Sequence, residues 1–453
     1  MSQTREDLHS LLYDLAEEAI EIAQSNSDGD IIETTEVPYL ERRYQTIDDS
    51  IDGSRIIRTT EEESNKNEIS TDVLRDTSQQ LQETEIYDRV ISEVESREFE
   101  SLIVPSPESS VTAYIQSILN GAKNGVSDRD IARHISIFTS EIDSAPISWN
   151  PKIWILGLDI EDDSVQLEEN ITIRKPDEDD LVEEIRIEDD AGFNRRATGM
   201  PERAPTAIIE FSKRAPDRRD IYDTIQVMIS VLQLYDVGSV SSMKVDLHTE
   251  SIIKPFPLPG RYNSPDTPFS YTISESEISD LSLFYTHMYE VVEERLYSTD
   301  EQDYLTISFD RYENAIEEND SPESQLTSAI MSLEAMLLKD EEKGELSERL
   351  SRRADILLGL FGHQPIEISR KIKTAYSIRS RYVHGSETDQ DYGEDLVSDI
   401  VDYTRNCIVI YLLLSEDFPK EKLLSKLDNA SVQAESREAL SEKIQEVVPE
   451  WAI

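Results

Sequence analysis

Cysteine is nearly absent from this chain: Cys407 is the only one in 453 residues. A single thiol forms no disulfide within the chain, and metal sites built from several cysteines are excluded. Glycine-rich phosphate loops are lacking too, since Gly157 and Gly199 stand isolated, which argues against a P-loop or dinucleotide site. We therefore expect a protein of a reducing compartment that uses no metal and no cofactor.

Long apolar runs are also missing. The longest, residues 408–414, is far shorter than the ~20 apolar residues that cross a bilayer. Met1 is followed by polar and charged residues, unlike the apolar core of a signal peptide. We expect a cytoplasmic protein with no membrane partner.

Positive charge is scarce: 44 Lys and Arg stand against 95 Asp and Glu, a formal net charge of −51. At molar salt the Debye length falls to about 3 Å, so exposed carboxylates stop repelling one another. The composition therefore indicates a salt-loving organism. A nucleic-acid mimic would gather its acids on one face, whereas here they are spread along the whole sequence.

The first half of the chain predicts an α+β multidomain fold. Residues 1–25 have apolar side chains at helical spacing, which predicts an amphipathic helix that packs on this chain or on a regulatory partner. Residues 26–86 are rich in small polar and acidic residues, as in an acidic, disordered linker. Residues 87–275 mix helical patterns with strand-like segments, which predicts a small-sheet α+β domain with a regulatory or sensor role.

The pattern becomes helical throughout residues 281–415. A serine, proline and glutamate at 321–323 form a capping pattern, and Gly385 follows an apolar stripe at the place where glycine ends a helix. Short connections between such helices predict an all-α bundle. Residues 416–453 are expected to form a C-terminal helical tail.

One segment has a net positive charge, opposite in sign to the rest of the chain. Between residues 349 and 384, eight basic residues stand against two acids. Either they pair with acids of neighbouring helices, or they form a phosphate-binding face. For RNA phosphates we predict these six: Arg349, Arg352, Arg353, Arg370, Lys371 and Lys373.

The end of this basic segment carries the one motif with chemical content. Arg379 and His384 are separated by four residues within TAYSIRSRYVHG, residues 374–385. This segment resembles the R-x4-6-H motif of HEPN domains, most closely of the Apea-like group. The apolar run at 333–338 with Glu334 embedded in it is similar to the acid-bearing helix of that family, and the likeness covers about residues 281–415.

The resemblance implies an all-α HEPN bundle and a metal-independent endoribonuclease that acts in antiviral defence or stress response. It implies that His384 moves a proton while Arg379 stabilises phosphate charge. It also implies a homodimer, with RNA as substrate and a site shared by two copies. Ser380 stands where many active members carry Asn, Asp or His, and Glu334 is a supporting residue that can orient an arginine.

Helix geometry leaves two arginines as partners of His384. On a regular helix Arg381 and His384 lie about 60° apart, whereas Arg379 and His384 lie about 140° apart. Arg381 is the nearer partner if the helix continues through His384, and Arg379 can converge on it if the helix ends at Val383. An alternative function uses the same basic face without catalysis: an HEPN protein that binds RNA or a nucleotide, or scaffolds a partner.

Overall fold

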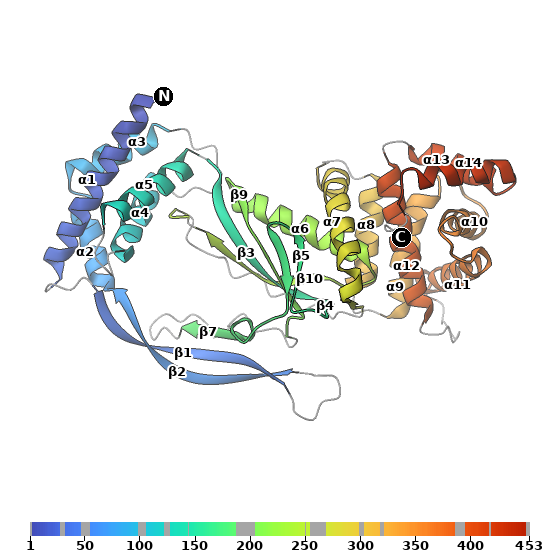
Figure 1. Ribbon diagram of the computed structural model, residues 1–453, viewed down its shortest axis with the longest axis horizontal. Coiled ribbons are helices and arrows are strands. Elements are labelled where there is room, and N and C mark those ends of the chain that lie inside the picture. Colours follow the sequence, from blue (N-terminus) through green and yellow to red (C-terminus); the bar gives the residue numbers. More distant parts are fainter. Residues whose placement is uncertain are drawn as a thin grey trace.

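The computed structural model has a mixed α+β fold (Figure 1). It describes residues 2–27, 32–46, 55–97, 106–121, 127–143, 145–186, 204–249, 251–253, 269–298, 303–317, 321–385, 395–415 and 418–449. None of the helices within these ranges is long and apolar enough to cross a membrane.

Five helices at the N-terminal end pack around one hydrophobic core. They are α1 (Ser2–Asn26), α2 (Thr71–Leu81), α3 (Glu85–Glu95), α4 (Pro107–Gly121) and α5 (Asp128–Ile142). The apolar face of α1 is buried within this core, with Leu8, Leu12 and Leu15 wholly inaccessible to solvent. That face therefore packs on the chain itself. The predicted domain at 87–275 placed α3, α4 and α5 together with the sheet. These helices instead share the core of the N-terminal helices.

The expected linker at 26–86 is wrong for the residues described there. Strands β1 (Ile32–Thr46) and β2 (Arg55–Ile69) form a long antiparallel ribbon, and β7 (Val182–Arg186) pairs with β1. The ribbon lies along the lower edge of the molecule in Figure 1. Pairing satisfies backbone groups whatever the side chains are. The acidic composition of β1 and β2 therefore gave no indication of strands in the sequence. The second partner of β1, β7, lies more than a hundred residues further along the chain, so local sequence patterns could not predict this pairing either.

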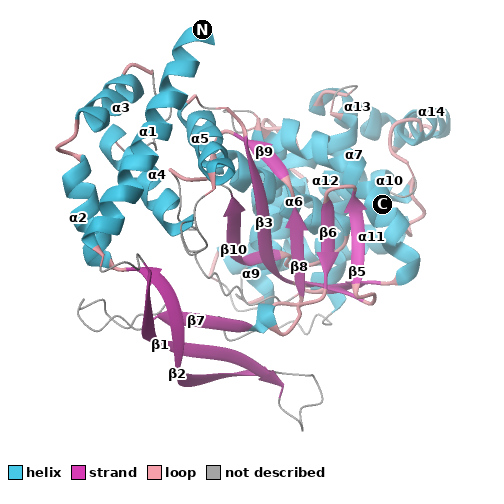
Figure 2. Ribbon diagram, turned by 60° about the vertical axis from the view of Figure 1, so that its left-hand side comes forward, coloured by secondary structure: helices cyan, strands magenta, loops and turns pink. Residues whose placement is uncertain are grey.

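The central sheet has the strand order β10-β3-β8-β6-β5, and β9 also pairs with β3. Figure 2 shows this sheet with helices behind it. The inward residues of β3, such as Ile153 and Ile155, are buried in a core shared with α6 and α7. The strands of this sheet are β3 (Ile147–Leu156), β5 (Ser164–Glu168), β6 (Ile171–Arg174), β8 (Ala207–Phe211), β9 (Lys213–Ala215) and β10 (Ser241–Thr249). A separate pair of parallel strands is formed by β4 (Leu158–Ile160) and β11 (Tyr271–Ile273), and a 3₁₀ turn lies at Asp179–Leu181.

The remaining elements of regular secondary structure in the described chain are helices or helical turns. They are α6 (Arg218–Tyr235), a 3₁₀ turn at Glu275–Glu277, α7 (Ile278–Val292), which runs into a π-helical turn at Glu293–Tyr297, α8 (Tyr304–Glu317), α9 (Pro322–Leu337), α10 (Leu346–Gly359), α11 (Pro365–Val383), α12 (Asp395–Leu414), α13 (Lys420–Ala430) and α14 (Ala434–Gln445). The Ser321 side chain caps α9 as its sequence predicts.

The sheet and the C-terminal helices share one continuous hydrophobic core. The predicted boundary between a middle domain and a bundle at about residue 280 is therefore not a boundary between cores. Helix α7 contacts both α6 and β5, which joins the two parts. Residues of α13 and α14, including Leu424 and Ile444, are buried in the same core, so residues 418–449 pack against the bundle.

Candidate functional site

Helix α11 carries the Arg379 and His384 motif and ends within it. The helix is regular from Pro365 to Val383, and His384 is its C-cap, with φ −88° and ψ 5°. The His384 amide donates to the Ser380 carbonyl at 3.3 Å. Gly385 adopts a left-handed φ of +67°, which glycine tolerates best and which stops the helix. The His384 residue is exposed at this helix end.

Arg379 lies on the inner side of α11, where it meets α9. Its Nη2 is 3.1 Å from Oε2 of Glu334. The side chains of the two residues are only 25% and 20% exposed, so this ion pair is partly shielded from water. Burial raises the pKa of Glu334, and the nearby Arg379 charge opposes that increase. The structure thus brings together two of the predicted site residues from different helices.

Tyr376 completes this group, and the motif gave no reason to select it. Its ring lies 5.8 Å from the Arg379 guanidinium carbon, and its hydroxyl lowers the pKa of the Glu334 carboxylate. Burial raises the pKa of Tyr376, and the Glu334 charge adds to the effect. The sequence could have indicated this contact, because Tyr376 precedes Arg379 by three residues and residues at i and i+3 lie on the same face of a helix.

The second candidate arginine, Arg381, has different surroundings. Its Nε and Nη2 lie 3.4 Å from the carbonyl and the hydroxyl of Ser377, one turn earlier on α11. The helix ends at Val383, but the His384 amide still donates to the Ser380 carbonyl in the helical pattern, so both arginines stay candidate partners of His384. His384 follows Arg379 by about 7.5 Å along the helix axis.

Arg353 does not belong to a phosphate-binding face, contrary to the sequence prediction. Its side chain is wholly buried, and its guanidinium donates to Glu342, to Asp428 of α13 and to the Leu337 carbonyl at 2.7–2.8 Å. A buried guanidinium that already has these acceptors has no exposed surface to offer a phosphate. The residue stabilises the packing of α10 against its neighbours.

Acids also accompany three of the other predicted phosphate ligands. Arg349 lies 3.4 Å from Glu342, and Lys373 lies 2.7 Å from Glu348. Lys371 contacts both Glu367 and Asp399. The remaining two, Arg352 and Arg370, are exposed. The pairing of charges anticipated as the alternative therefore accounts for part of the basic segment.

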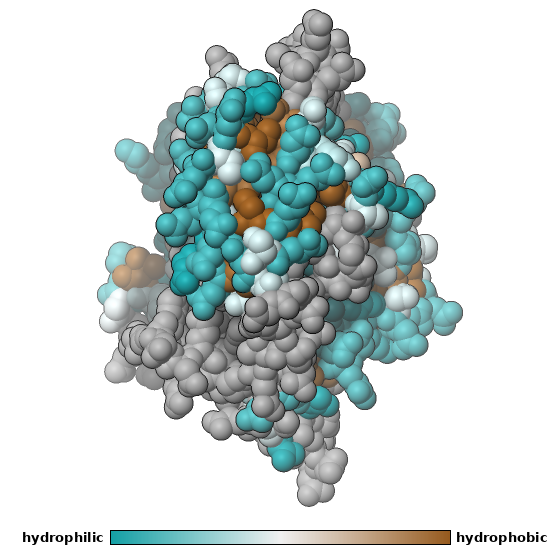
Figure 3. Space-filling view, turned by 90° about the vertical axis from the view of Figure 1, so that its left-hand side faces the viewer, coloured by the Kyte–Doolittle hydropathy of each residue, from teal (hydrophilic) through white to brown (hydrophobic). Residues whose placement is uncertain are grey.

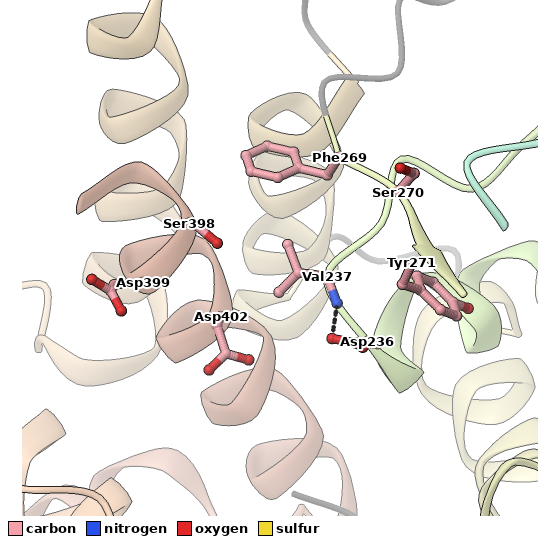
Figure 4. A pocket seen from close by; sticks show the side chains of 8 residues that line it. All are labelled: Asp236, Val237, Phe269, Ser270, Tyr271, Ser398, Asp399 and Asp402. Atoms are coloured by element: carbon pink, nitrogen blue, oxygen red, sulfur yellow. Dashed lines mark hydrogen bonds between the residues drawn. The ribbon is translucent and has the colours of Figure 1, made fainter. Parts of the chain in front are cut away.

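A pocket of about 540 Å³ lies between the strand β11 region and the start of α12 (Figure 4). None of the residues predicted for the site lines it. Two of its aspartates are ion-paired, Asp399 with Lys371 and Asp402 with Arg405. The lining residues are Asp236, Val237, Phe269, Ser270, Tyr271, Ser398, Asp399 and Asp402.

Among the described residues, no group of three or more His, Cys, Asp or Glu side chains is placed to hold a metal ion. Comparisons with protein-family models, with curated proteins and with solved structures found no match to this chain.

Proposed function

We propose that this chain is a metal-independent endoribonuclease of the HEPN type, with its site at the C-terminal end of α11. One observation carries the proposal: Arg379 is held across the α9–α11 interface by Glu334, close along the helix to an exposed His384. A charged guanidinium can stabilise phosphate charge and an imidazole can transfer a proton, which are two functions that cleavage beside a ribose 2′-hydroxyl needs.

In the proposed reaction, the ribose 2′-oxygen attacks the adjacent phosphorus and the bond to the 5′-oxygen breaks. The products are a 2′,3′-cyclic phosphate and a 5′-hydroxyl. His384 transfers the proton, as histidine does best near neutral pH. Arg379 stabilises the charge on the non-bridging oxygens.

A second copy of the chain is proposed to complete the site, because one copy supplies one Arg379 and one His384. Support comes from apolar surface beside the histidine. Tyr382 and Val383 are 44% and 56% exposed, and large exposed apolar side chains at a helix end favour association. Arg352 and Arg370 would bind RNA phosphates further along the surface. We place this activity in the cytoplasm of a halophile, in antiviral defence or stress response.

A non-catalytic role in binding RNA or a nucleotide, or in scaffolding a partner, is the second candidate. The ion pairs of Lys371, Lys373 and Arg379 favour the scaffolding form of this role over RNA or nucleotide binding, because paired cations attract phosphate less strongly.

The deciding experiment is incubation of RNA with wild-type protein and with the variant His384→Ala, in molar potassium chloride, once with EDTA and once without it. His248→Ala, which alters an exposed histidine of β10, is the control. We expect wild type and control to release 2′,3′-cyclic phosphate ends, and His384→Ala to be slower by about 10²-fold or more.

Equal cleavage by wild type and His384→Ala, or cleavage by neither, would rule out the catalytic proposal. RNA binding without cleavage would favour the second candidate. Cleavage that EDTA abolishes would indicate a metal-dependent reaction instead.

A further inference from the structure

Three side chains gather around one guanidinium at the α9–α11 interface. Glu334 pairs with the Arg379 guanidinium, and the Tyr376 ring lies against that guanidinium. Arg379 thus contacts both of the other residues. Two contacts restrict the rotation of this side chain more than a single ion pair does.

These contacts determine which nitrogen atom of the Arg379 guanidinium faces Glu334. Nη2 is directed to Glu334, while Nε is buried without a hydrogen-bond partner among the described residues. An arginine normally places its five N–H groups where acceptors are available. The unsatisfied Nε indicates that packing, more than hydrogen bonding, sets the orientation of this side chain, and the Tyr376 ring is part of that packing.

The tyrosine hydroxyl also affects the charge of its neighbour. Burial raises the pKa of Glu334, whereas the Arg379 charge and the Tyr376 hydroxyl both lower it. If Glu334 took up a proton, its attraction for Arg379 would weaken. The hydroxyl therefore helps to keep the carboxylate ionised and the ion pair intact.

We infer that Tyr376 is a positioning residue for the RNA-cleaving site: its ring and hydroxyl hold Glu334 and Arg379 in one arrangement, which directs Arg379 toward an RNA phosphate. This inference rests on the proposed ribonuclease function. Tyr376 itself does not touch the substrate. It acts through the orientation and ionisation of its two partners.

The first test compares cleavage of RNA by wild type and by Tyr376→Phe, which keeps the ring and removes the hydroxyl. Tyr222→Phe, altered at a half-buried ring of α6, is the control. We expect Tyr376→Phe to lower kcat by about 10-fold to 100-fold with little change in KM, because small errors in position have large effects on rate. The acidic limb of its pH–rate profile should move to higher pH, which a general loss of packing would not produce.

The second test does not depend on activity. In protein labelled with ¹⁵N on arginine, the Nε–H signal of Arg379 is identified by its disappearance in Arg379→Lys. We expect this signal to shift and broaden in Tyr376→Leu and in Glu334→Gln, and to be unchanged in Tyr222→Phe. Thermal unfolding of each variant verifies that it is folded.

The two tests separate the two proposals. If wild type cleaves no RNA, the ribonuclease proposal fails, and the role of Tyr376 as a positioning residue for that reaction fails with it, whatever the NMR signal shows. If wild type cleaves RNA but the Arg379 signal is the same in Tyr376→Leu, or the pH profile of Tyr376→Phe is unchanged, the positioning role is overturned while the ribonuclease proposal stands.

Discussion

The guanidinium of Arg353 lies inside the helical core between two carboxylates, Glu342 and Asp428. Removing one partner of a buried ion pair is strongly destabilising, because the remaining charges have lost their compensation. We predict that Arg353→Ala lowers the free energy of unfolding by about 3–5 kcal/mol. Urea denaturation measures this, with the exposed neighbour Arg352→Ala as control. Equal losses in both variants would contradict the assignment.

Glu313 should make stability depend on pH. Burial, together with the negative charges of Glu317 and Asp310, raises its pKa from 4.5 to about 8. The folded state therefore binds the proton more tightly than the unfolded chain. Its contribution to stability is complete below about pH 4.5 and is lost as pH rises through 8.

The corresponding experiment measures urea midpoints of wild type and Glu313→Gln at pH 6 and pH 9. We expect wild type to lose more stability than the variant over this range, since glutamine does not ionise. Glu290→Gln, at an exposed position of α7, serves as the control. A pH dependence that is the same in all three proteins would refute the prediction.

Helix α5 is joined to the chain segment after β10 through a single buried carboxylate. Glu141 accepts hydrogen bonds from the amides of Ile252 at 2.7 Å and Ile253 at 3.2 Å, and from the Ser251 hydroxyl. Ile252 and Ile253 are buried in the N-terminal core. This contact therefore joins the N-terminal helices to the segment that follows β10 of the central sheet.

We predict that Glu141→Ala destabilises this attachment by about 1–3 kcal/mol for each amide left without an acceptor. Hydrogen exchange of the Ile252 and Ile253 amides should become faster, and the unfolding midpoint should fall. Glu95→Ala, at an exposed position of α3, should change neither quantity. Unaltered exchange at both amides would show that Glu141 is not what protects them.

The whole molecule carries a net charge of −51, and this charge governs its response to salt. Figure 3 shows a largely hydrophilic surface over the described part of the N-terminal face. Repulsion between exposed carboxylates opposes folding at low ionic strength, when the Debye length is about 10 Å, and is screened at 1 M, when it is about 3 Å.

We therefore predict that the unfolding temperature rises between 0.1 M and 2 M potassium chloride. Calorimetry at several concentrations tests this. Repeating the series with sodium chloride separates screening from an effect specific to potassium. A midpoint that is constant or falls with salt would contradict both this prediction and the proposed halophilic origin.

The sequence by itself determined the helical character of residues 281–415 and the ends of individual helices there, because apolar spacing and capping residues act within a few positions of the chain. Helix α9 begins after Ser321, and α11 ends at Val383 just before Gly385. Helix α2, by contrast, lies within the segment expected to be a linker.

Only the tertiary structure decided which of these elements are partners and which charges are neutralised. The strand β1 pairs with β7, Arg353 is buried beside Asp428, and Arg379 pairs with Glu334. Each of these contacts joins residues far apart in the chain, where local periodicity carries no information. Burial and ion pairing depend on such distant neighbours. For this reason the motif residues and Glu334 could be selected from the sequence, but Tyr376 and the contacts that orient Arg379 were found only in the structure.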